Sequence, residues 1–135
     1  MKVIDATGAP LGRLSSLLAK QLLDGEEIAV VNAEQAVIVG RRRAIEKRYR
    51  FKREVGGTKR KGPYFPRMPD QILKRTVRGM LPYQQPRGRQ ALKNLKAYIG
   101  VPEQLAEAQA EKLAETTTSP HITLKQLSNY LGVTW

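Results

Sequence analysis

The chain has 135 residues and a formal net charge of +12, from 24 lysines and arginines against 12 aspartates and glutamates. It has no cysteine, which excludes disulfides, thiolate metal sites and thiol catalysis. It also lacks the apolar run of ~20 residues that a membrane-spanning helix needs, and it does not begin with the apolar stretch of a signal peptide. These features predict a single cytosolic domain over 1–135.

The positive charge is concentrated in the middle of the chain. Residues 41–96 hold 19 of the 24 basic residues, 12 of them arginine, and only three acidic ones, Glu46, Glu54 and Asp70. Such a concentration opposes compaction unless a polyanion neutralises it, and the planar fork of arginine suits phosphate oxygens. Solvated helix faces are the ordinary alternative, but the scarcity of acidic neighbours favours nucleic-acid binding.

The N-terminal third predicts alternating strands and helices. A short strand is expected at 3–6, and leucines then recur at three- and four-residue steps over 11–23, which predicts a helix that ends before Gly25. The continuous apolar runs at 28–32 and 36–40 are typical of strands covered on both faces, as in parallel sheets. This order favours an α/β fold with right-handed crossovers.

The basic middle predicts three helices with apolar inner faces. They are expected over 41–53, from an N-cap at Asp70 to about residue 81, and from Pro86 onward. The residues expected to face inward are Ile45, Tyr49, Leu73, Val77, Met80, Leu92 and Leu95. Lysines and arginines occupy the opposite faces of these helices.

The segment between the first two of these helices predicts an extended basic loop, an insertion at about 55–69. It contains three glycines and three prolines and has no aliphatic face to bury. Such a loop suits a segment that becomes ordered between RNA helices, but a flexible surface loop is an equal alternative from the loop alone.

The last third predicts a strand, two helices and a loop. The strand is expected at 97–101, and Pro102 opens an alanine-rich helix to about Glu115. Glutamates at every fourth residue would form an acidic stripe on that helix, as a solvated face or a contact with a basic neighbour. A short final helix would dock through leucines within 124–131.

Candidate catalytic groups are few. His121 is the only histidine, and the carboxylates show no pairing by spacing, so no catalytic, metal or cofactor site is predicted. Residues 7–13 lie between a strand and a helix, where phosphate-binding loops occur, but they lack both the Walker and the dinucleotide spacing. A nucleotide-using enzyme with a Rossmann-like core is therefore the weaker rival hypothesis.

Three blocks of sequence resemble the signature of the ribosomal protein L-thirteen family of the large subunit. They are Val-Arg-Gly-Met-Leu-Pro at 77–82, Gly-Arg at 88–89 and Leu-Lys-Ala-Tyr-Ile-Gly at 95–100. Further blocks at 4–8, 11–13 and 30–34 also resemble this family. The blocks at 62–67, 69–70 and 74–76 resemble its archaeal and eukaryotic branch. The short tail favours the archaeal form.

The resemblance implies a three-layer α/β/α fold around a four-stranded parallel sheet. It implies a structural constituent of the large ribosomal subunit in the cytoplasm, bound to large-subunit rRNA and beside other ribosomal proteins, with no catalytic centre and no cofactor. The family also includes members with roles in translational control. An mRNA-binding regulator that uses the same basic surface therefore stays an alternative.

The residues expected to bind rRNA come from this basic middle. Recognition should depend mainly on RNA shape, with phosphate contacts setting position. The expected contacts are Arg41, Arg42, Arg48, Lys59, Arg60, Lys61, Arg67, Lys74, Arg75, Arg78, Arg87, Arg89 and Lys93, with Tyr64 and Phe65 as stacking residues. Arg13 is a weaker candidate, because it suits packing within the fold equally well.

Overall fold

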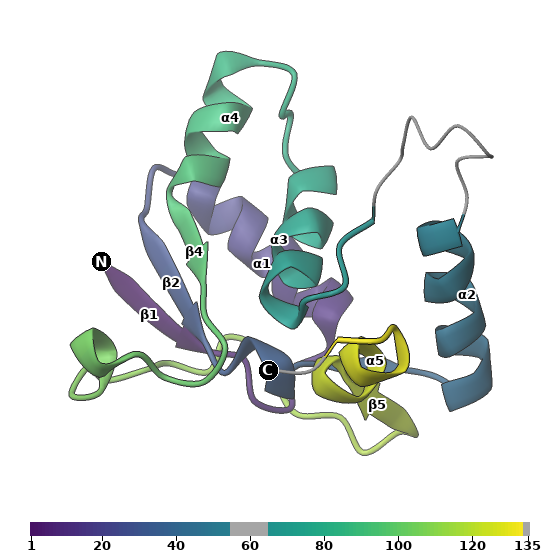
Figure 1. Ribbon diagram of the computed structural model, residues 1–135. Coiled ribbons are helices and arrows are strands. Elements are labelled where there is room, and N and C mark those ends of the chain that lie inside the picture. The colour runs from purple at the N-terminus through teal and green to yellow at the C-terminus, as the bar shows by residue number, and fades with distance from the viewer. Residues whose placement is uncertain (55–64, 134–135) are drawn as a thin grey trace.

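The computed structural model describes residues 1–54 and 65–133 (Figure 1). In chain order its elements are β1 (Lys2–Asp5), α1 (Leu11–Leu23), β2 (Ile28–Val31), the 3-10 helix η1 (Ala33–Gln35), β3 (Val37–Val39), α2 (Arg42–Glu54), α3 (Pro69–Gly79), α4 (Pro86–Lys93), β4 (Leu95–Ala97), the 3-10 helix η2 (Glu103–Leu105), β5 (His121–Thr123) and α5 (Leu124–Tyr130). The predicted α/β class is confirmed, and α1 has the bounds that its leucine spacing predicted.

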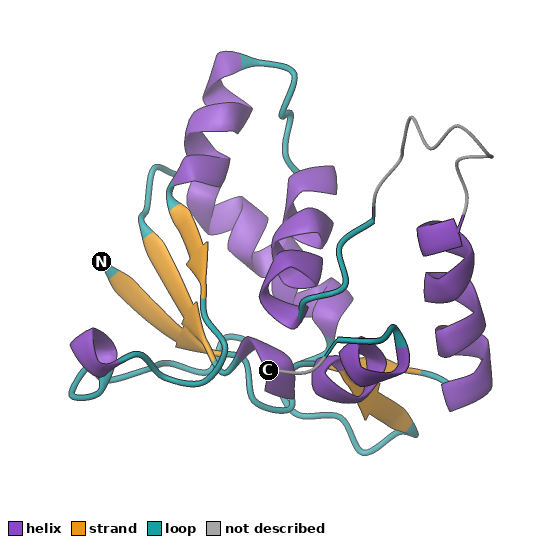
Figure 2. Ribbon diagram, in the orientation of Figure 1, coloured by secondary structure: helices purple, strands orange, loops and turns teal. Residues whose placement is uncertain are grey.

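A parallel sheet forms the centre of the fold. Its strands lie in the order β1-β2-β4, with Val3 opposite Ala29 and Val30 opposite Ala97. All four residues of the central strand β2 are buried, which explains its continuous apolar sequence. Helices α1, α3 and α4 lie together beside the sheet (Figure 2). Their leucines and isoleucines form the core with the sheet.

The expected fourth parallel strand is wrong. In the described part of the chain the parallel sheet has three strands, and β3 pairs instead with β5 in a separate antiparallel sheet, with Ile38 opposite Ile122. Only residues 32–36 separate β2 from β3, whereas a parallel crossover needs about a dozen residues or more. Asn32, in the left-handed conformation at φ 55°, turns the chain there.

The expected alanine-rich helix is also wrong. Apart from η2, residues 102–120 form no helix, so the acidic stripe does not exist. The segment has only Leu105 and Leu113 as large apolar residues after residue 102, too few for a helix to bury a face. It pairs with β1 instead: Glu111 donates to the Val3 carbonyl at 3.0 Å, and Asp5 donates to the Glu111 carbonyl at 2.8 Å.

Several smaller expectations need correction at helix and strand ends. Helix α3 begins at Pro69 after Met68, and Asp70 makes no capping hydrogen bond. The helix ends at Gly79, so Met80 turns outward and is 43% exposed, while Ile72 takes the inward position. The strand expected at 97–101 is shorter and begins two residues earlier, as β4 (Leu95–Ala97).

The turn that follows β1 is closed by hydrogen bonds within the fold. The Asp5 carboxylate accepts from the Thr7 amide at 3.0 Å, the Thr7 hydroxyl at 2.7 Å and the Asn32 amide group at 3.2 Å. Burial raises the pKa of Asp5, but these hydrogen bonds outweigh it and hold the pKa below its usual value. Gly8, at φ 72°, donates to the Gln35 carbonyl at 2.9 Å. Asp5 and Gly8 are thus engaged by the fold itself, as expected of a tight turn.

Candidate nucleic-acid interface

Most of the described basic residues of the region 41–96 belong to α2, α3 and α4, where they are exposed or half-buried. In the described part of the chain, only Arg42 and Arg50 of this region form ion pairs. Each pairs with a glutamate four residues further on: Arg42 with Glu46 at 2.7 Å, and Arg50 with Glu54 at 3.0 Å. The described surface of these helices therefore carries a large excess of positive charge that no acidic side chain neutralises.

Helix α2 presents cations on most of its circumference. Its buried residues are Ile45 and Tyr49, the pair that the four-residue spacing predicted. Arg41, just before the helix, and Arg42 and Arg48 within it are exposed. The charged outer face of this helix must therefore face either solvent or a polyanion.

Helix α3 places three predicted cations, Lys74, Arg75 and Arg78, along two adjoining hollows. The larger, of about 300 Å³, is lined by them together with Pro66, Gln71 and Leu92. The smaller, of about 190 Å³, is lined by Arg75, Arg78, Gly79 and Tyr83. The Arg78 guanidinium lies 4.4 Å from the centre of the Tyr83 ring, a cation–π distance.

Sequence reasoning missed Gln71 and Leu92 as members of this surface. Gln71 precedes Lys74, Arg75 and Arg78 by three, four and seven residues, so helical spacing places it on their face. That signal was available in the sequence. The position of Leu92 beside α3 depends on how α4 packs, and no local pattern reports it.

Helix α4 exposes three more of the predicted cations. Arg87, Arg89 and Lys93 are all exposed, and Arg89 donates to the Gln84 carbonyl at 3.3 Å. Pro86 occupies the first turn, as predicted. Arg67 is exposed in the segment before α3. The other predicted contacts, Lys59, Arg60, Lys61 and Tyr64, lie outside the described residues.

Phe65 is not free to stack on RNA in this structure, contrary to the expectation. Only 9% of it is exposed. Its ring packs edge-to-face on Tyr49, with centroids 5.6 Å apart and an interplanar angle of 66°. Arg53 also donates to the Phe65 carbonyl at 2.8 Å. Phe65 therefore attaches α2 to the rest of the molecule.

Cations surround this aromatic pair. The Lys52 ammonium lies 4.7 Å from the centre of the Tyr49 ring and 5.2 Å from that of Phe65, and the Arg75 guanidinium lies 5.5 Å from the Phe65 ring. Burial, followed by repulsion from Arg48 and Arg75, lowers the pKa of Lys52. Repulsion among cations of α2 and α3 thus opposes the contact that the aromatic rings make.

Replacing Phe65 by alanine should therefore destabilise the fold by about 2 kcal/mol, because a nearly buried aromatic side chain is lost. Phe51 offers a matched control on α2, since it is 67% exposed. Phe51→Ala should leave the urea unfolding midpoint nearly unchanged. If the two variants unfold at the same urea concentration, the assignment of Phe65 to the core is wrong.

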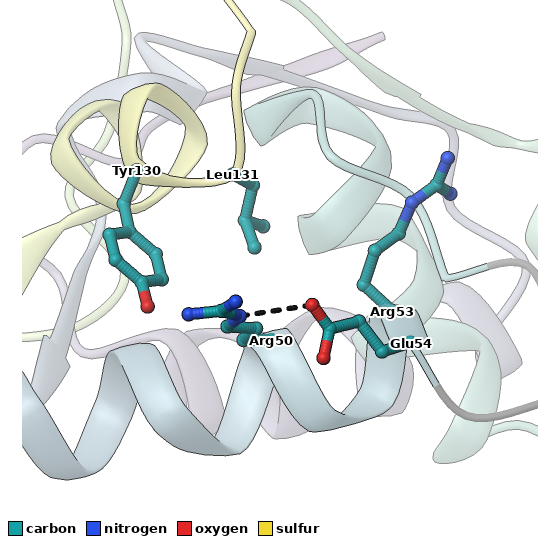
Figure 3. Close-up of a pocket in the computed structure, with 5 residues that line it drawn as sticks. All are labelled: Arg50, Arg53, Glu54, Tyr130 and Leu131. Atoms are coloured by element: carbon teal, nitrogen blue, oxygen red, sulfur yellow. Dashed lines mark hydrogen bonds and ion pairs between the residues drawn. The ribbon is translucent and has the colours of Figure 1, made fainter.

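A third hollow, of about 290 Å³, lies between α2 and α5 and is lined by Arg50, Arg53, Glu54, Tyr130 and Leu131. Figure 3 shows the Arg50 guanidinium between the Glu54 carboxylate and the Tyr130 ring. The hydrogen bond from Arg50 to Glu54 raises the pKa of Arg50. Because this arginine already has a carboxylate partner, the hollow is a poorer anion site than the face of α3.

The described residues offer little for catalysis. No group of three or more His, Asp or Glu residues among them could hold a metal ion. His121 is exposed, and its Nδ1 lies 2.7 Å from the Ser119 carbonyl oxygen. None of the helices in residues 1–54 and 65–133 has the length and apolar character needed to cross a membrane.

The family model and the similar proteins that match this chain point to the same family. Residues 1–104 match the family described as Ribosomal protein L13. Proteins named large ribosomal subunit protein uL13 are 51% identical in Archaeoglobus fulgidus, over 96% of this chain and 86% of the relative. The proteins of that name in Methanosarcina barkeri and Methanocaldococcus jannaschii are also 51% identical, each over 98% of both chains.

The family match covers most of the chain, and the similar archaeal proteins extend over nearly all of it. The resemblance drawn from residues 77–100 is therefore confirmed. The family is one of ribosomal proteins and not of enzymes, which removes the rival hypothesis of a nucleotide-using enzyme. The chain belongs to the ribosomal protein L13 family.

Proposed function

We propose that the chain is a structural constituent of the large ribosomal subunit and binds large-subunit rRNA through the cations of α2, α3 and α4. Its archaeal relatives carry the name of a large-subunit protein. The observation that carries the rRNA contact is the excess of exposed or half-buried cations on three helices, of which only Arg42 and Arg50 pair with acids in the described part. Lysine and arginine that neutralise phosphates release counterions, which supplies most of such binding.

In this proposal the sheet and α1 act as a rigid support. The inner faces of α3 and α4 are fixed by Leu73, Val77 and Ala91, which are buried. Their outer faces are thereby held in one orientation, so phosphates of separate RNA segments meet a preformed surface. Lys59, Arg60 and Lys61 lie in the sequence between α2 and α3 and belong to the same proposal. The neighbours in the cytoplasmic particle would be rRNA and other large-subunit proteins.

The test is sedimentation of a cell lysate through a sucrose gradient, with the chain detected by an antibody. We expect the chain to migrate with the large subunit and to stay there at moderate salt, because many phosphate contacts act together. The small-subunit fractions serve as the internal control. A chain found only at the top of the gradient, or with mRNA apart from ribosomal particles, would contradict the structural role and favour the mRNA-binding alternative.

A further inference from the structure

The two hollows on α3 adjoin each other, because Arg75 and Arg78 line both. A volume of about 300 Å³ lies at the small end of ligand pockets, so the larger hollow suits a single small unit rather than a duplex.

Two of the three cations of this site, Arg75 and Arg78, contact aromatic rings of the protein. The Arg78 guanidinium stacks on Tyr83 at 4.4 Å, and the Arg75 guanidinium lies 5.5 Å from the Phe65 ring. Neither these arginines nor Lys74 forms an ion pair with any described acid. Because stacked guanidinium groups have already lost part of their freedom, binding an anion costs less entropy here than at an extended surface arginine.

The remaining lining residues have a different chemistry from a phosphate site. Leu92 and Pro66 give the larger hollow apolar surface. Gln71 adds a side-chain amide, whose NH₂ group donates hydrogen bonds and whose oxygen accepts them. A phosphate needs neither. An unpaired base needs an apolar or aromatic support for its ring and a polar partner for its edge.

We propose that the hollow formed by Gln71, Lys74, Arg75, Arg78 and Leu92 binds one unpaired nucleotide of the RNA. Lys74, Arg75 and Arg78 contact its phosphates, the base lies against Leu92 and Pro66, and the Gln71 amide reads the base edge. This inference rests on the proposed rRNA binding. It adds a base-specific position to a surface that otherwise recognises phosphates and shape.

The experiment uses the full chain bound to large-subunit rRNA. Hydroxyl radicals report where the RNA backbone is covered, and reagents that modify the Watson–Crick edges of all four bases report which unpaired bases are covered. We expect the wild-type chain to protect one unpaired base within its backbone footprint. Gln71→Ala should raise the reactivity of that base about fivefold, the effect of one lost hydrogen bond, and leave the backbone footprint intact.

Gln90→Ala is the matched control, because Gln90 is an exposed helical glutamine on α4 that does not line the hollow. It should leave both footprints unchanged. Neither change alters the charge, and alanine is favourable in helices, so loss of fold does not confuse the result. If the backbone footprint is present but no base responds to Gln71→Ala, the nucleotide site is wrong and rRNA binding stands. If the wild-type chain leaves no footprint at all, the proposed function itself fails, and the nucleotide site with it.

Discussion

The affinity of the chain for large-subunit rRNA should fall by on the order of ten-thousandfold to a hundred-thousandfold when monovalent salt is raised from about 50 to about 200 mM. The reason is the number of phosphates involved: about ten exposed or half-buried cations on α2, α3, α4 and the adjoining segments are proposed to contact RNA, and each neutralised phosphate releases a counterion. Filter binding at a series of salt concentrations measures the slope of log affinity against log salt. An affinity that stays flat across this range would contradict binding through phosphates.

The slope can be assigned to one face by substitution. Replacing Lys74, Arg75 and Arg78 together by alanine should reduce the slope by about two to three, because each lost phosphate contact removes slightly less than one unit. The matched control is the triple alanine variant of Lys20, Lys112 and Lys125, which removes the same charge from exposed positions outside the region 41–96. It should leave the slope nearly unchanged. Equal effects of the two variants would show that net charge alone, and not this face, determines binding.

Gly88→Ala should destabilise the fold by about 3 kcal/mol and lower the melting temperature by about 10 °C. Gly88 is buried in α4, and a β-carbon there would overlap the carbonyl group of Pro82 in the preceding turn. The obstacle is backbone rather than a flexible side chain, so α4 must move to relieve it. That movement would also displace Arg87 and Arg89, and rRNA affinity should fall with stability.

Gly12→Ala is the control for this prediction. Gly12 lies in α1, and apart from its chain neighbours and the backbone of its own helix turn, no described atom lies within 4 Å of the position its β-carbon would take. Alanine there should be neutral or stabilise the helix by up to about 1 kcal/mol. Thermal unfolding followed by circular dichroism measures both variants. A Gly88→Ala chain that melts at the wild-type temperature would mean that α4 does not pack on the 80–85 turn as described.

The elements that could be predicted from the sequence are those whose pattern is local. The leucine spacing over 11–23 gave α1 its bounds, and the apolar pair Ile45 and Tyr49 identified the inner face of α2. The charge concentration in 41–96 predicted which helices present cations, because acids are too few there to neutralise them. Periodicity and charge are properties of short windows, so a single chain reports them directly.

The errors arose where distant contacts or chain length decide the structure. The apolar run of β3 resembles a buried parallel strand, but the short connection from β2 forbids that pairing, and this rule could have been applied to the sequence. Phe65 stands among basic loop residues, and nothing local reveals that Tyr49 receives its ring. Likewise the hollow on α3 needs Leu92 from another helix, so its floor could not be predicted from spacing alone.

The pairing of Glu111 with Val3 and Asp5 has a consequence for the newly synthesised protein. An outer strand with free amides and carbonyls invites pairing with a second copy, which is a common start of aggregation. Here residue 111 occupies part of the open side of β1, and the Lys2 ammonium lies 3.8 Å from the Glu111 carboxylate, so charges flank that margin. On the opposite margin, β4 carries the exposed Lys96. Both margins of the sheet thus carry features that disfavour pairing with a second copy of the chain.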